Sequence, residues 1–120
     1  MQHQPPVGAK QPRAKSMPTT VTRAAGLAFT KALSKELAPH NILVNTVCIG
    51  LVRAGQHERK ATKAGIAVEQ LYADMAKDIP LGRVGRAEEV ANAIAFLASA
   101  TASYVTGTSI NLDGGTSAVL

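Results

Sequence analysis

The run of residues 42–50 constrains the fold of this chain most, because it is the most apolar stretch and is rich in β-branched side chains. Such a run, ending on a glycine, predicts a buried β-strand. Ligands of open α/β sheets bind beyond the carboxyl ends of the strands. The loop 50–53 is therefore the first place where we expect a functional site.

A long helix precedes this strand. It is predicted to start at Thr19 or Thr20, either of which can cap a helix, and to end near Ala38. One side repeats apolar residues every four positions, namely Val21, Ala25, Phe29, Leu33 and Leu37. Polar side chains, including Thr30 and Ser34, fill the other side. This pattern predicts an amphipathic helix.

The rest of the chain is predicted to add helices and a second strand. The expected ranges are short helices at 55–64 and 68–75, a helix at 88–98 and a strand at 108–112. This order predicts an α/β fold with two parallel strands, because parallel pairs need such long connections. Parallel sheets are normally buried within larger ones, and two strands alone are marginal. We therefore predict an incomplete sheet with flanking helices, which is part of a domain.

Positive charge is concentrated at the N-terminus. The 120 residues have a net charge of +5, and residues 1–16 contribute Lys10, Arg13 and Lys15 without any acid. We predict a disordered basic tail at 1–17 and a folded part at 18–120. The folded part is close to neutral, and aromatic residues make up only 3% of the chain, so we expect no nucleic-acid partner.

The composition also excludes other classes. The single cysteine, Cys48, cannot form an intramolecular disulfide, which is typical of a reducing compartment. No run approaches the roughly 18–20 apolar residues that span a bilayer. The three histidines, His3, His40 and His57, do not have the spacing of metal ligands. We expect a cytoplasmic protein without a membrane segment or a metal site.

Three segments resemble the short-chain dehydrogenases/reductases, and they occur in the order found in that family. They are TKALSKELAPHNILVNTV (30–47), IPLGRVGRAEEVANAIAFLAS (79–99) and YVTGTSINLDGG (104–115). The resemblance covers about residues 18–115 and corresponds to the C-terminal part of a Rossmann-type NAD(P)-binding fold. It implies hydride transfer between NAD or NADP and an alcohol or carbonyl substrate.

The catalytic positions of that family are altered in this chain. The family motif is Tyr, three residues, then Lys, and the corresponding positions are Thr19 and Arg23. A Tyr phenol beside a cation can act as an acid or base, whereas Thr19 cannot ionise near neutral pH. Arg23 keeps a positive charge that could hold ribose hydroxyls. We therefore predict that no catalytic residue is intact.

The resemblance also implies cofactor contacts after the strand. The predicted cofactor-binding residues are Arg23, Ile49, Gly50, Leu51 and Val52. Val52 occupies the position whose backbone meets the nicotinamide carboxamide, and Gly50 would allow a close backbone approach to the ligand. The glycine-rich turn that cradles a pyrophosphate does not occur in this chain, so we do not expect the chain alone to hold the whole cofactor.

Two functional hypotheses follow, and a remote third remains. In the first, the chain is a truncated segment of such an oxidoreductase and is inactive alone. In the second, it is a non-catalytic interaction module whose helix at 20–38 packs against a full-length relative or a second copy. The third is RNA binding through the turn at 82–86, which has the GXXG pattern of a KH-type loop.

Overall fold

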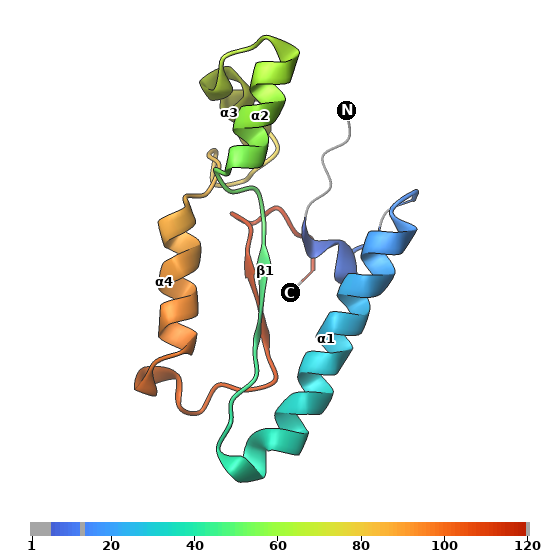
Figure 1. Cartoon of the computed structure of the whole chain (residues 1–120), viewed down its shortest axis with the longest axis vertical. Coiled ribbons are helices and arrows are strands. Elements are labelled where there is room, and N and C mark those ends of the chain that lie inside the picture. Colours follow the sequence, from blue (N-terminus) through green and yellow to red (C-terminus); the bar gives the residue numbers. More distant parts are fainter. Residues whose placement is uncertain (1–5, 13, 120) are drawn as a thin grey trace.

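The computed structural model describes residues 6–12 and 14–119. Its elements in chain order are η1 (Pro6–Ala9), α1 (Met17–Leu37), η2 (Ala38–His40), β1 (Thr46–Ile49), α2 (Gly55–Ala64), α3 (Val68–Ala76), α4 (Ala87–Leu97), η3 (Ala100–Ala102) and β2 (Ser109–Leu112), where η marks a short 3-10 helix. Helices α1 and α4 lie on opposite sides of the two strands, and α2 and α3 lie together beyond the end of β1 (Figure 1). No described helix has both the length and the apolar character needed to cross a membrane.

The two strands form the parallel pair that the sequence predicts. Thr46 is opposite Ser109, and Ile49 is opposite Leu112. The sheet contains only these two strands within the described residues, so β1 keeps one edge unpaired. The α/β class and the incomplete sheet are therefore confirmed.

Strand β1 is shorter and less buried than the apolar run suggests. It begins at Thr46, because Asn45 is engaged instead with the loop before β2. The Asn45 amide donates to the Val105 carbonyl at 2.8 Å and accepts from the Thr108 backbone N–H at 3.2 Å. Ile49, the last residue of β1, is 38% exposed. The expectation of a buried strand is thus met at Cys48 but not at Ile49, and β2 is the one strand beside β1 within the described residues.

Helix α1 turns polar residues toward the sheet. The Thr30 hydroxyl lies 2.6 Å from the Thr46 hydroxyl of β1, and Ser34 is only 3% exposed. Val21 and Phe29, on the apolar side of the predicted helix, are 56% and 64% exposed. This arrangement is the reverse of an ordinary amphipathic helix, which buries its apolar stripe. The apolar side of α1 is therefore exposed at Val21, Ala25 and Phe29, whereas Leu33 and Leu37 on the same side are half-buried.

The hydrophobic core lies beside α3, not around the sheet. Tyr72 and Met75 of α3 pack with Ile79 and Val84 from the following turn, and Leu51 packs against this cluster. The core therefore joins α3 to the loop that leaves β1.

Part of the segment predicted as a tail is attached to the fold. Residues 6–9 form η1, which packs against α1. The Lys10 ammonium donates to the Asn111 side-chain oxygen at 2.9 Å and to the Ser109 carbonyl at 3.3 Å. Within the segment predicted as a tail, η1 thus contacts α1, Lys10 contacts β2, and Met17 already belongs to α1. Residues 1–5 and 13 of that segment lie outside the described part of the chain.

Candidate functional site

All five residues predicted to bind a cofactor line one hollow. Its volume is about 470 Å³, and its walls include Arg23 from α1 and residues 49–52 from the end of β1. Thr19 is one turn before Arg23 on the exposed part of α1, and it does not line the hollow. The Thr19 hydroxyl donates to the Ser16 carbonyl at 3.2 Å. The fold thus brings the five predicted binding residues together in one hollow. Thr19, at the altered catalytic position, lies outside that hollow.

Gly50 is required by a contact within the chain. Its backbone N–H donates to the Leu112 carbonyl at 2.7 Å, which extends the strand pairing by one bond. A Cβ at Gly50 would lie 2.7 Å from the Cβ of Asp113. The close approach that we expected toward a ligand is therefore made by the backbone after β2.

The segment after Gly50 continues as an extended edge. Gly85 donates its N–H to the Leu51 carbonyl at 2.9 Å and accepts from the Arg53 N–H at 2.9 Å. Backbone groups of successive extended residues point to opposite sides. The N–H and C=O of Val52 consequently point away from Gly85. Such a donor and acceptor on one edge can bind a primary amide.

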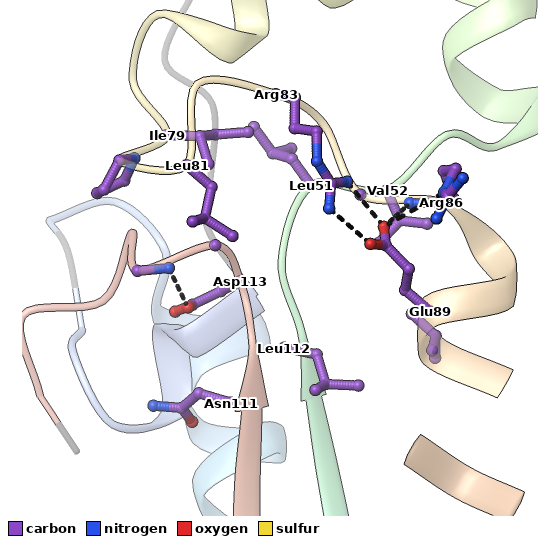
Figure 2. A pocket seen from close by; sticks show the side chains of 15 residues that line it. Leu51, Val52, Ile79, Leu81, Arg83, Arg86, Glu89, Asn111, Leu112 and Asp113 are labelled. Atoms are coloured by element: carbon purple, nitrogen blue, oxygen red, sulfur yellow. Dashed lines mark hydrogen bonds and ion pairs between the residues drawn. The ribbon is translucent and has the colours of Figure 1, made fainter. Parts of the chain in front are cut away.

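Three charged residues, Arg83, Arg86 and Glu89, lie beside Leu51 and Val52. The Arg83 guanidinium makes two bonds to the Glu89 carboxylate, at 2.6 and 2.9 Å, and the Arg86 backbone N–H donates to the same carboxylate at 2.7 Å. Figure 2 shows these bonds beside Leu51 and Val52, in a second hollow of about 530 Å³. The bonds from Arg83 and then Arg86 lower the pKa of Glu89 to about 2.

This cluster also bears on the GXXG pattern at 82–86. The Arg83 side chain is engaged with Glu89, and Val84 belongs to the hydrophobic core. A KH-type GXXG loop contacts the nucleic-acid backbone directly. In this chain Arg83 and Val84 are engaged within the fold, where the turn connects α3 to α4.

A second ion pair holds the residue after Val52. The Arg53 guanidinium makes two bonds to the Glu69 carboxylate of α3, at 2.8 and 2.9 Å. These bonds raise the pKa of Arg53 and lower the pKa of Glu69. Both side chains are partly exposed, so the pair fixes geometry more than it stabilises the fold.

Sequence reasoning missed the wall that α2 contributes. Gln56 and His57 from the first turn of α2 line the hollow together with Ala54. His57 is buried, and this burial, followed by the nearby Lys60 charge, lowers the pKa of His57. The signal was present, because a helix that starts directly after a ligand loop places its first turn beside that loop. The sequence by itself shows no partner that would make His57 a base and no metal-ligand spacing around it, so it gives this residue no role.

Comparisons with known proteins identify relatives over most of the chain. A family model described as enoyl-(acyl carrier protein) reductase matches residues 7–117. The chain is 42% identical over 96 residues to the 3-oxoacyl-[acyl-carrier-protein] reductase FabG of Aquifex aeolicus, covering 80% of this chain and 36% of that protein. It is 39% identical over 110 residues to the NADPH-dependent reductase BacG of Bacillus subtilis, covering 88% of this chain and 42% of that protein.

Solved structures give the same result. The NADPH-bound short chain oxidoreductase of Pseudomonas aeruginosa, described as containing an atypical catalytic center, has a TM-score of 0.83 and 38% identity. That similarity covers 95% of this chain and 44% of the other. YwfH, an NADPH-dependent reductase involved in bacilysin biosynthesis, has a TM-score of 0.80 and 36% identity, covering 93% of this chain and 44% of the other. The chain thus spans less than half the length of these relatives.

Proposed function

The chain belongs to the short-chain dehydrogenase/reductase family, and from this premise we propose that its hollow beside Arg23 is the nicotinamide side of an NAD(P) site. The reaction class is hydride transfer between the cofactor and an alcohol or carbonyl substrate. The observation that carries the proposal is that Arg23 and residues 49–52, which lie far apart in sequence, line one hollow.

The chemistry of the hollow suits the nicotinamide and its ribose. A carboxamide presents both a donor and an acceptor, and the backbone of Val52 offers the complementary pair on the edge opposite Gly85. The Arg23 guanidinium supplies several N–H donors, which can bind ribose hydroxyls. When bound, the cofactor would supply or accept the hydride. The residues of this chain would only hold and orient it.

We further propose that the chain alone does not turn over NADH or NADPH. The Thr19 hydroxyl cannot replace a phenol that transfers a proton near neutral pH. The Pseudomonas relative is described as containing an atypical catalytic center, and Thr19 with Arg23 makes the corresponding positions of this chain atypical as well. Consumption of NADPH by the pure chain with any carbonyl substrate would contradict this part.

Nicotinamide mononucleotide is the sharpest probe of the binding proposal, because it carries only the half of the cofactor for which the hollow offers contacts. We expect a titration followed by NMR to shift the backbone amide of Val52. The Arg23→Met variant should weaken the titration by about fivefold or more, the equivalent of about 1 kcal/mol. Lys35→Met, which changes an exposed cation on the same helix, is the matched control. An absence of shifts at Val52 would overturn the proposal.

A second candidate function rests on the exposed side of α1. Val21 and Phe29 are more than half exposed, and Ala25, which lies between them on the same side of the helix, is exposed as well. An exposed apolar side with a small residue at its middle suits helix packing. We propose that this side binds a second copy or a full-length relative. Sedimentation of the chain, alone and mixed with FabG, measures both forms of association.

A further inference from the structure

Tyr72 of α3 contacts three residues of the segment that follows Val52. Its hydroxyl accepts a hydrogen bond from the Ala54 backbone N–H at 3.3 Å. The Arg53 guanidinium lies over its ring, 4.6 Å from the centroid. The His57 ring meets it edge-on, with the centroids 6.1 Å apart and the planes at 76°. One side chain thus contacts the backbone, a cation and an aromatic ring of the same short segment.

Tyr72 is itself firmly held. It is 5% exposed and belongs to the core cluster with Met75, Ile79 and Val84. One turn earlier on α3, Glu69 binds the Arg53 guanidinium that stacks on Tyr72. Residues three apart on a helix are neighbours on its surface, so Glu69 and Tyr72 act on Arg53 together.

The extended edge at Val52 is therefore anchored from both sides. Before it and after it, Leu51 and Arg53 bond to the backbone of Gly85. Directly beyond it, the Arg53 guanidinium stacks on the Tyr72 ring and the Ala54 N–H donates to the Tyr72 hydroxyl. The N–H and C=O of Val52 face away from Gly85. Their direction depends on two sets of contacts, the backbone bonds to Gly85 and the contacts of Arg53 and Ala54 with Tyr72. The backbone bonds at Gly85 fix the strand-like pairing, whereas Tyr72 fixes where the chain turns into α2.

We propose that Tyr72 is a positioning residue, whose hydroxyl sets the direction of the Val52 edge by holding the Ala54 backbone. The ligand of that edge rests on the proposed function above, but the positioning is a property of the free chain. Tyr72 does not line the hollow that contains Arg23. It acts on the ligand-binding edge indirectly, through its contacts with Arg53, Ala54 and His57.

The test compares Tyr72→Phe with the wild-type chain. This variant keeps the ring, its contacts with Arg53 and His57, and its place in the core, and removes only the acceptor for the Ala54 N–H. Amide hydrogen exchange of the full chain is the first readout. Exchange of the Ala54 amide should be about fivefold faster, the equivalent of one lost hydrogen bond worth about 1 kcal/mol. Amides of β1 should exchange as before. Tyr104→Phe is the matched control, because Tyr104 is fully exposed.

The second readout is the titration with nicotinamide mononucleotide. Tyr72→Phe should weaken it several-fold, while Tyr104→Phe leaves it unchanged. Unchanged exchange at Ala54 would overturn the positioning role, and so would faster exchange throughout the chain, which indicates a general loss of stability. Faster exchange at Ala54 with no binding by any variant would leave the positioning role standing and overturn the proposed function instead.

Discussion

At the scale of single residues, the site is built from backbone contacts that only certain side chains permit. Gly50 illustrates this point, since its missing Cβ makes room for the backbone at Asp113. The sequence identified the glycine but assigned the close approach to a ligand, because a single chain does not reveal which segment comes near. The gathering of Arg23 with residues 49–52 was predictable from the family motif, whereas the contribution of His57 depended on the start of α2.

Substituting Gly50 should therefore destabilise the fold. The added methyl group of Gly50→Ala would collide with Asp113, and such overpacking typically lowers the free energy of unfolding by about 1–3 kcal/mol. Gly26→Ala is the matched control, because its Cβ meets nothing within 4 Å and alanine favours a helix interior by up to about 1 kcal/mol. Urea unfolding of both variants measures the difference. Equal stability of Gly50→Ala and wild type would show that the contact at Asp113 relaxes freely.

His57 should make stability depend on pH. Burial, and then the Lys60 charge, lower the pKa of His57 below its ordinary value of about 6.5, and the Arg53 cation also lies on the Tyr72 ring that His57 contacts. The folded state thus binds fewer protons than the unfolded state. The contribution of neutral His57 to the stability of the fold is complete above pH 6.5. It is lost as the pH falls from 6.5 through the lowered pKa of His57. Urea unfolding between pH 8 and pH 5 should show this loss.

The variant His57→Gln separates this histidine from other titrating groups. Its stability should fall less steeply between pH 8 and pH 5 than that of the wild-type chain. His40→Gln changes an exposed histidine and should retain the wild-type slope. Identical slopes for wild type and His57→Gln would show that His57 does not carry the effect.

At the scale of elements, the sequence predicted the boundaries of the helices better than the side that each helix turns toward the sheet. Helix α2 covers the predicted 55–64, and α4 and β2 agree with their predictions within one residue at each end. These boundaries follow from local signals such as glycine turns and acidic first turns. The orientation of α1 did not follow, because Thr30 and Ser34 are drawn to the sheet by contacts with residues distant in sequence. The predicted length of β1 was wrong for the same reason, because the Asn45 side chain bonds to the distant Val105 carbonyl.

The link between the turn at 82–86 and α4 depends on Glu89. Its pKa is lowered to about 2, so its favourable contribution is present above its ordinary value of about 4.5 and is lost as the pH falls from there toward 2. Glu89→Gln should reduce stability at pH 7 and flatten the acid limb of the unfolding profile. Glu88→Gln, at the neighbouring exposed position, is the control. A profile of Glu89→Gln that follows the wild type in acid would contradict this assignment.

At the scale of the whole molecule, two features stand out. The cluster of large buried side chains lies on α3 and the adjoining turn, and the outer side of α1 is apolar and exposed at Val21 and Phe29. The sequence predicted that β1 lacks a neighbour, because its apolar run exceeds what one partner strand can cover. The hypothesis of an interaction helix at 20–38 presupposes an accessible face on α1, but which side is exposed depends on how the helix packs on so small a sheet.

If α1 mediates association, its apolar side should control the mass in solution. Phe29→Asp places a charge on that side and should shift sedimentation toward the monomer. Phe96→Asp on α4, where the aromatic ring is also about half exposed, is the matched control and should sediment like the wild type. Equal effects of both variants would indicate unspecific association through any exposed apolar side chain. If the wild-type chain is a monomer at high concentration, the proposal that α1 mediates self-association is wrong.

The pairing of β1 with β2 also has a consequence in time. Ser109 follows Thr46 by 63 positions, so the sheet contact that β1 makes within residues 6–12 and 14–119 is with a segment that is synthesised much later. At about 5–20 residues per second, a ribosome would need roughly 3–13 s to reach the partner strand. During this interval the backbone of β1 can bond to any extended segment nearby, and the yield of native chain would depend on how quickly translation proceeds.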